Sequence, residues 1–242
     1  MRNILKTIVG FSVGALAFTA CEKENEKPSD SNDYFPLQVG KYILYDVDSV
    51  DYDNASKTTY INSYQMRYEV VDSFVDNAGR ISYTINVYER PKSDVAFTPR
   101  DVIHVTKTER GVEWTQSNAK LLKLAFPISE DTRWMGVTYI DQREPGMDEY
   151  NPQRYNWRFY YSNIGAEFDP GNNPFYKTVT VNGIDEATNE PGDTVYADRN
   201  YYQEVYAAGV GMVYRERIYW VWDIEAQYKN GYELRMRAVD QN

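Results

Sequence analysis

The chain alternates apolar and polar residues in short runs, and this alternation limits its fold more than any other feature. After residue 21, no stretch keeps apolar residues at helical spacing over ten positions. Ile81, Tyr83, Ile85 and Val87 instead fall on one side of an extended strand. The 23 tyrosines, the 15% aromatic content and the many β-branched residues also favour strands. We therefore predict an all-β fold, an antiparallel curved open sheet or flattened half-barrel with few or no helices.

Clusters of glycine, proline, asparagine and aspartate separate these runs, as turns between strands do. The expected strands before the C-terminal hairpin cover residues 34–52, 62–75, 81–89, 102–108, 112–116, 119–126, 135–141, 154–162 and 176–181. Two polar stretches, 142–153 and 182–193, are expected to be loops. The chain from residue 34 to residue 242 suits one all-β domain or two small lobes, and we predict one domain.

The C-terminal hairpin permits a prediction of strand register. A three-residue loop, Lys229-Asn230-Gly231, would close with Gly231 in the left-handed conformation and pair Tyr228 with Tyr232. A two-residue Asn-Gly turn would instead place apolar residues on the same face as arginines. The expected partners are Ala226 with Leu234, Ile224 with Met236, Trp222 with Ala238, Glu225 with Arg235, and Asp223 with Arg237. Because opposite charges and apolar pairs then meet across the strands, we predict the three-residue loop.

The first 21 residues, MRNILKTIVGFSVGALAFTAC, combine a short basic region with an apolar run that ends at a cysteine. Thirteen apolar residues, 8–20, are too few to cross a bilayer as a helix, which needs roughly 20. Residues 1–20 are therefore expected to be a signal peptide. Ala20-Cys21 resembles the lipobox of bacterial lipoproteins. The resemblance implies a diacylglyceryl group on the Cys21 sulfur, cleavage before Cys21 and acylation of the new amino terminus.

Cys21 is the single cysteine of the sequence, and His104 is the single histidine. One cysteine cannot form a disulfide within the chain and cannot build a cysteine-based metal site. One histidine without a cysteine partner does not make a typical zinc site. We expect no metal and no cofactor.

Residues 21–33 form a polar segment without apolar residues after the cysteine, so we expect a disordered tether. Glu22, Glu24 and Glu26 resemble the acidic export signals of surface lipoproteins of Bacteroidota. That resemblance implies anchoring in the bacterial outer membrane, with the cell surface favoured over the periplasmic face. Loss of Arg2 and Lys6 with the signal peptide leaves 24 basic and 36 acidic side chains, a net charge of −12. Such an acidic body argues against nucleic acid as a partner.

Two short motifs carry a further resemblance. YFPLQVGKY (34–42) opens the domain, and YAAGVGMVYRE (206–216) places Gly209 and Gly211 before a strand, where a glycine-permitted bend is expected. Together they resemble uncharacterised exported lipoprotein domains of Bacteroidota, which look broadly like lipoprotein-carrier half-barrels. The resemblance implies an antiparallel sheet curved around a cavity and an apolar ligand. It transfers no catalytic residue.

Candidate site residues follow from composition rather than from a catalytic motif. The aromatic residues that could face a glycan or lipid ligand are Trp157, Tyr160, Tyr201, Tyr202 and Tyr219. Glu144, Asp148 and Glu149 could supply paired carboxylates for glycoside hydrolysis, but such pairs are common in an acidic protein. Asp48-Ser49-Val50 and Asp193-Thr194-Val195 match the O-glycosylation pattern of Bacteroidota and would have to be exposed.

These observations favour a non-enzymatic function at the cell envelope. The first hypothesis is an accessory or structural binding subunit, held to the membrane by lipid on Cys21 and partnered by an outer-membrane protein complex. The second is a carrier of lipid or small apolar ligands, which requires a concave apolar cavity. The third is a glycan-binding surface lipoprotein, which requires exposed coplanar aromatic rings.

Overall fold

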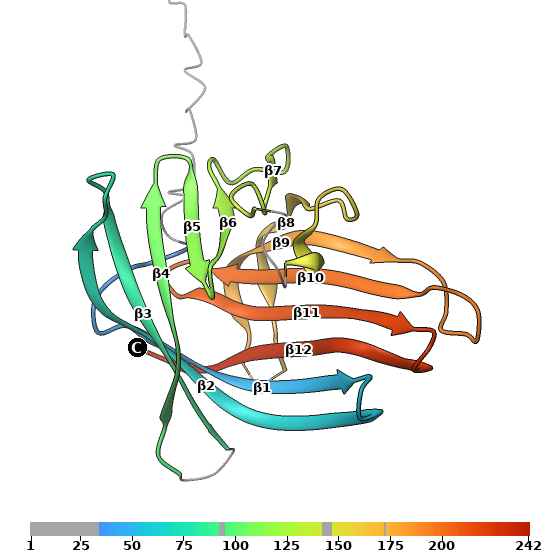
Figure 1. The fold of residues 1–242 in the computed structure, drawn as a ribbon. Helices are drawn as coiled ribbons and strands as arrows, with labels where there is room; N and C mark the ends of the chain where they lie inside the picture. Colours follow the sequence, from blue (N-terminus) through green and yellow to red (C-terminus); the bar gives the residue numbers. More distant parts are fainter. Residues whose placement is uncertain (1–33, 92–94, 142–146, 172) are drawn as a thin grey trace, which may run out of the picture.

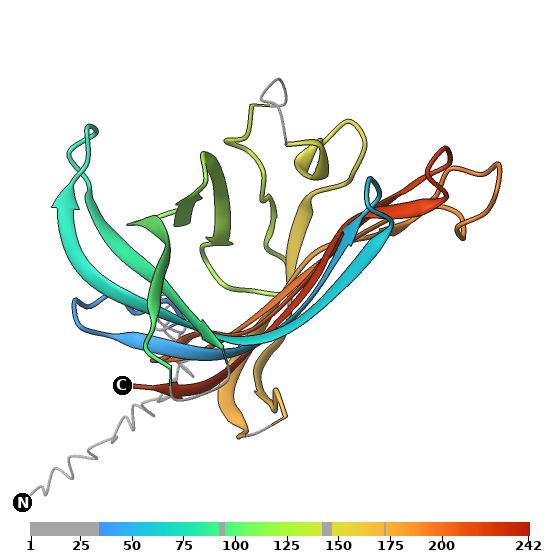
Figure 2. The ribbon, with the colours of Figure 1, turned by 60° about the horizontal axis from the view of Figure 1, so that its bottom comes forward.

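The computed structural model describes residues 34–91, 95–141, 147–171 and 173–242. In these residues, twelve strands form one antiparallel sheet, accompanied by a single 3-10 turn, η1 (Asp148–Tyr150), and no α-helix. The sheet curves into a deep trough, which is visible in two views (Figures 1 and 2). The prediction of an all-β curved antiparallel sheet is confirmed.

Strands that are neighbours in the sheet are also consecutive in the sequence, except where β1 pairs with β12. The first half supplies β1 (Tyr42–Asp53), β2 (Thr58–Val75), β3 (Ile81–Pro91), β4 (Thr98–Thr108), β5 (Gly111–Gln116) and β6 (Ala119–Ala125). The second half supplies β7 (Arg133–Met135), β8 (Arg158–Phe168), β9 (Phe175–Ala187), β10 (Asp198–Ala207), β11 (Gly211–Asp223) and β12 (Tyr228–Gln241). The spatial order is β6-β5-β4-β3-β2-β1-β12-β11-β10-β9-β8-β7, so the first and last strands pair at the centre.

The two edges of the sheet, β6 and β7, approach each other. The Leu122 N–H donates to the carbonyl of Gly136 at 2.8 Å, and Trp134 Nε1 donates to the Leu122 carbonyl at 2.8 Å. Exposed strand edges invite pairing with other chains, and these contacts cover part of both edges. The sheet is thus nearly closed into a barrel.

The concave face of the sheet carries the core. Alternate residues of the strands point inward, among them Tyr45 and Val47 of β1 and Met236 of β12, all fully buried. Ile85 and Val87, expected on one face of a strand, are also buried, whereas Ile81 at the start of β3 is 61% exposed. Each fully buried apolar side chain stabilises the fold by roughly 1.5–3 kcal/mol.

Two neighbouring hairpins end in the same kind of turn. Asp53 Oδ1 accepts the N–H groups of Ala55 and Ser56 at 2.9 and 3.3 Å between β1 and β2. Asp223 Oδ1 accepts the N–H groups of Glu225 and Ala226, each at 2.9 Å, between β11 and β12. An aspartate that caps its own turn in this way fixes the loop locally.

The predicted register of the C-terminal hairpin is wrong. The connection consists of residues 224–227, and Asp223 pairs with Tyr228. Tyr232 pairs with Tyr219 rather than with Tyr228, and Gly231 lies inside β12 opposite Trp220. The Asp223 turn decides the register, so that Lys229-Asn230-Gly231 is strand and not loop.

The corrected register changes which side chains of β11 face the interior. Leu234 pairs with Arg217 and Met236 pairs with Arg215, so that two arginines occupy positions that a purely apolar interior would exclude. The expected ion pairs change as well. Arg235 binds Glu216 at 2.5 Å, and Arg237 binds Asp48 of β1.

Other boundaries also differ from expectation. The polar stretch 182–193, expected to be a loop, extends β9 as far as Ala187. The strand expected at 135–141 is the short β7, which ends at Met135 and is followed by turns. Gly209 and Gly211 form the bend between β10 and β11 with positive φ angles of 75° and 115°, as expected.

Candidate functional site

An open cavity of about 460 Å³ lies on the concave face, between strands from both halves and the η1 segment. Five aromatic rings line it: Tyr64, Tyr68, Trp114, Tyr150 and Tyr232. Its wall also contains apolar side chains and three charged ones that matter below, Arg100, Glu149 and Arg215. A mixed wall of this volume is typical of pockets for small organic ligands.

A buried charged cluster lies in the wall behind the cavity, and we call it the Lys123 cluster. It consists of Lys123 on β6, Tyr202, Glu204 and Tyr206 on β10, and Arg215 on β11. Lys123 Nζ lies 2.6 Å from Glu204 Oε1, and their side chains are 1% and 0% exposed. Lys123 also donates to the Tyr202 hydroxyl, and the Tyr206 hydroxyl donates to Glu204 Oε2 at 2.5 Å. The cluster joins the two halves of the sheet.

Burial and pairing oppose each other in this cluster. Burial lowers the pKa of Lys123 to about 7, although Glu204 favours its charged form. Burial alone would raise the pKa of Glu204, but the charges of Lys123 and Arg215 outweigh it and lower that pKa. Glu204 is therefore ionised at neutral pH and depends on its cationic neighbours.

A second charged group fixes the η1 segment beside the cavity. Arg217 Nη2 binds Glu149 Oε2 at 2.6 Å, and the Tyr232 hydroxyl donates to the same oxygen at 2.7 Å. Trp157 Nε1 and Asn200 Nδ2 donate to the Glu149 carbonyl at 3.1 and 2.9 Å. Arg217 Nη1 has acceptors as well, including Asn200 Oδ1 at 2.7 Å. Glu149 is thus a structural anchor of this segment.

Arg215 differs from these neighbours because it lacks acceptors. Its side chain is 12% exposed and lines the cavity, and its Nε lies 3.5 Å from Glu204 Oε1 in an ion pair. That Nε atom is buried without a hydrogen-bond partner. Within the described ranges, no nitrogen of the guanidinium donates a hydrogen bond to the protein. Four buried side-chain atoms of the described residues lack a hydrogen-bond partner, among them Arg217 Nε, and Arg215 is the residue of these four that lines the cavity.

The structure divides the five predicted aromatic residues between two faces. Trp157 and Tyr202 are buried and in contact inside the fold, with ring centroids 5.8 Å apart. Tyr219 is half-buried and packs against Tyr155. Tyr160, 40% exposed, and Tyr201 line a separate groove of about 260 Å³. The five side chains therefore do not form one flat stacking surface.

Cys21 and Glu144 lie outside the described residues. Ser49 is 7% exposed and lies in the cavity wall, which removes it as an accessible glycosylation acceptor. Thr194 is exposed. In the part of the chain that the structure describes, no group of three His, Cys, Asp or Glu side chains is placed to hold a metal ion.

The sequence interpretation missed Arg215, Arg217 and Lys123. In the run Tyr214-Arg215-Glu216-Arg217, the sequence alone does not decide whether the two arginines or the residues that alternate with them face inward. Their acidic partners are 11 to 81 positions away in the sequence, as the pairs Glu204–Arg215 and Lys123–Glu204 illustrate. A sequence signal for the arginines does exist. Tyr232 and Leu234 fall on the apolar face of their strand, and a turn at Asp223 places Arg217 opposite Leu234 on that same face.

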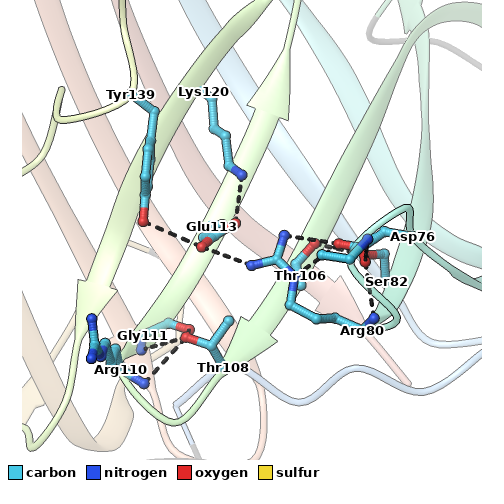
Figure 3. Close-up of polar contacts among 11 residues, drawn as sticks. Asp76, Arg80, Ser82, Thr106, Thr108, Arg110, Gly111, Glu113, Lys120 and Tyr139 are labelled. Atoms are coloured by element: carbon cyan, nitrogen blue, oxygen red, sulfur yellow. Dashed lines mark hydrogen bonds and ion pairs between the residues drawn. The ribbon is translucent and has the colours of Figure 1, made fainter.

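Another polar group lies outside the cavity, around Glu113 on β5 (Figure 3). Glu113 is 6% exposed, and its carboxylate binds Arg80 Nη1 at 3.1 Å and Lys120 Nζ at 2.6 Å. The Tyr139 hydroxyl donates to it at 3.3 Å. Burial would raise the pKa of Glu113, but hydrogen bonds and ion pairs with Lys120 and Arg80 outweigh burial and lower it. The group joins β5, β6, the turn between β2 and β3, and the segment after β7.

Glu113→Gln is expected to lower the free energy of unfolding by about 1 kcal/mol at neutral pH. Because the folded-state pKa of Glu113 is lowered, its stabilising effect is present above the unfolded-state pKa, near 4.3, and is lost as pH falls through the folded-state pKa. Urea unfolding of both proteins across this pH range measures the effect. The difference should shrink below about pH 4. The exposed Glu190, changed to Gln, is the control for loss of a surface charge and should change the free energy of unfolding little. A difference that is independent of pH would contradict this account.

No family model matches the chain, and no curated protein matches it in sequence. Among solved structures, a candidate exported protein with a YmcC-like fold from Bacteroides fragilis NCTC 9343 is 14% identical, with a TM-score of 0.33, and the match covers 86% of this chain and 99% of that chain. A candidate lipoprotein from Parabacteroides distasonis ATCC 8503 is 14% identical, with a TM-score of 0.34, over 86% of this chain and 98% of that chain. The chain is distantly similar in structure to these proteins, and the likeness assigns no function to the cavity.

Among the described residues, no helix has the length and apolar character that a membrane span requires.

Proposed function

We propose that this chain is a non-enzymatic binding protein of the cell envelope, anchored by lipid on Cys21, whose half-barrel holds a small molecule. The observation that supports it is the open cavity of about 460 Å³ on the concave face. Pockets of roughly 300–1,000 Å³ with aromatic walls and a few placed polar groups are the usual sites for small ligands.

The lining favours an amphipathic ligand. Tyr68 and Trp114 lie side by side with ring centroids 6.1 Å apart, and Met66 extends the same wall. Aromatic rings and a flexible methionine accept apolar bodies of various shapes. Polar groups such as Gln116 and Arg215 border this apolar area and would orient the ligand.

The carboxylates near the cavity are engaged in ion pairs, and this supports a binding function without catalysis. Glu204 is held by Lys123 and Arg215, and Glu149 is held by Arg217 and Tyr232. A general acid or base must exchange a proton near the operating pH, whereas the lowered pKa of Glu204 keeps that carboxylate ionised. The two carboxylates brace the cavity wall, and Lys123, whose pKa is about 7, is 1% exposed and is not among the residues that line the cavity.

The anchor rests on the sequence. The lipobox-like Ala20-Cys21 would place lipid at the start of the tether, 21–33, and the domain from residue 34 onward at some distance from the outer membrane. The twelve residues after Cys21 span at most about 40 Å. A binding domain on such a tether can meet its ligand or an envelope partner away from the lipid surface.

Phenylnaphthylamine (NPN), an uncharged dye that fluoresces in apolar sites, tests the binding function with the purified full chain. We expect saturable binding to one site. Ala119→Trp adds a bulky side chain to the cavity wall and should abolish that binding without lowering the melting temperature. Val102→Trp, at a position that is 46% exposed, is the matched control and should bind as the unchanged protein does. Absence of saturable binding, or equal binding by Ala119→Trp, would refute the proposal.

A further inference from the structure

We infer that the ligand of this cavity carries an anionic oxygen group, a carboxylate or a phosphate, which is bound by Arg215. This inference rests on the proposed function, because it assigns the chemical class of the molecule in the same cavity. Two observations support the inference. The guanidinium of Arg215 is nearly buried and has no hydrogen-bond acceptor among the described residues, and it lies in the wall of a cavity that a ligand can enter.

The charges around the cavity do not balance. Lys123 pairs with Glu204 at 2.6 Å and Arg217 pairs with Glu149 at 2.6 Å, so each carboxylate already has a close cation. Arg215 is the third cation of this interior and reaches Glu204 at 3.5 Å, beyond hydrogen-bonding geometry. A buried charge that lacks hydrogen bonds to an opposite charge destabilises the fold, and an anionic ligand would supply Arg215 with such a partner.

The geometry of arginine suits such an anion. A guanidinium offers donors in a planar fork that matches a carboxylate or phosphate with two parallel hydrogen bonds. Burial opposes the charge of Arg215, but Tyr202 and Glu204 outweigh it and raise its pKa, so the group remains a cation. The fork is available because the protein supplies no acceptor to it within the described ranges.

The rim of the cavity is a less suitable place for the anion. Arg100 is 44% exposed and already binds Glu89. Asp51 and Glu233 also line the cavity, and an anion beside either of them would be repelled. A ligand with one anionic end would therefore place that end at Arg215 and its apolar body along Tyr68 and Trp114.

Anilinonaphthalene sulfonate (ANS) tests the inference because it has the same ring body as NPN and adds one anionic oxygen group. We expect the full chain to bind ANS at least about tenfold more tightly than NPN. Arg215→Gln should remove this preference, so that the ratio of ANS affinity to NPN affinity falls at least about tenfold. Arg215→Lys keeps the charge without the fork and should give an intermediate ANS affinity. Arg235→Gln, which removes one cation at a 51% exposed position, is the matched control and should alter neither affinity.

The outcomes separate the two proposals. If neither dye binds, the cavity is not a ligand site and the proposed function fails. If NPN binds but Arg215→Gln leaves ANS affinity unchanged, the cavity binds ligand and the assignment of an anion to Arg215 is overturned. Equal loss of both dyes in Arg215→Gln also overturns it, since the variant then damages the whole cavity.

Displacement of ANS by decanoate and by decyl phosphate, but not by decanol, supports the inference, and the stronger competitor distinguishes carboxylate from phosphate. Displacement by decanol alone would contradict it.

Discussion

Lys123→Met is expected to lower the free energy of unfolding by about 3–5 kcal/mol, because it leaves the carboxylate of Glu204 buried without its closest cation. Glu204 is fully buried, and its remaining ion pair, with Arg215, is longer at 3.5 Å. Urea unfolding at neutral pH measures the loss. It should diminish as pH is lowered from about 8 to about 5, since an unpaired buried carboxylate takes up a proton and becomes neutral.

Two further variants define the origin of that loss. The double variant Lys123→Met/Glu204→Gln removes both charges, and we expect it to recover a large part of the stability, with a coupling energy of at least about 1 kcal/mol. Lys120→Met is the matched control on the same strand. Its ion pair with Glu113 is partly exposed on the lysine side, at 32%, so the cost should stay near 1 kcal/mol. A cost below about 1 kcal/mol for Lys123→Met would show that the cluster does not depend on this pair.

Local periodicity was sufficient to predict the strands and their burial through much of the chain. Val87 and Val47 alternate with polar residues and are buried, because one face of a curved sheet must exclude water. The bend at Gly209 and Gly211 was predictable for a local reason as well, since positive φ angles favour glycine. These features depend on residues within a few positions of each other.

The C-terminal register failed because its prediction assumed a uniformly apolar interior. That assumption placed Trp222 and Ile224 inward and the arginines of β12 outward. The Asp223 turn instead sets a register that points Arg215 and Arg217 of β11 inward, where Glu204 and Glu149 pair with them. Glu149 lies 68 positions from Arg217, and strand periodicity contains no information about such a partner.

The same reason explains why the candidate site was incomplete. A count of aromatic residues could propose Trp157 and Tyr202, and both lie close to the interior charges. It could not show that they are buried or that Tyr160 and Tyr201 line another groove. The chemistry of the cavity instead depends on Arg215, whose significance is its lack of hydrogen-bond acceptors, and this appears only in three dimensions.

Gly231→Ala is expected to lower the free energy of unfolding by about 3–5 kcal/mol, since it combines backbone strain with a steric clash. Gly231 has a φ of 139°, and a Cβ atom there would lie 2.1 Å from the Tyr219 carbonyl oxygen and 2.7 Å from Trp220 Cα. The clashing atoms are backbone of β11, so they cannot move without disturbing the pairing of β11 with β12. Thermal and urea unfolding measure the loss.

Gly209→Ala provides the comparison that makes this result a test of register. Gly209 has a φ of 75° with no atom within 4 Å of a Cβ, so the change introduces strain without a clash and should cost about 1–2 kcal/mol. The three-residue loop predicted from sequence would place Gly231 in a similarly open left-handed position, where alanine costs about the same. Equal losses for the two variants would therefore favour that loop. A clearly larger loss for Gly231→Ala places this glycine between Tyr52 and Trp220 in the paired strands, and with it Arg215 and Arg217 in the interior.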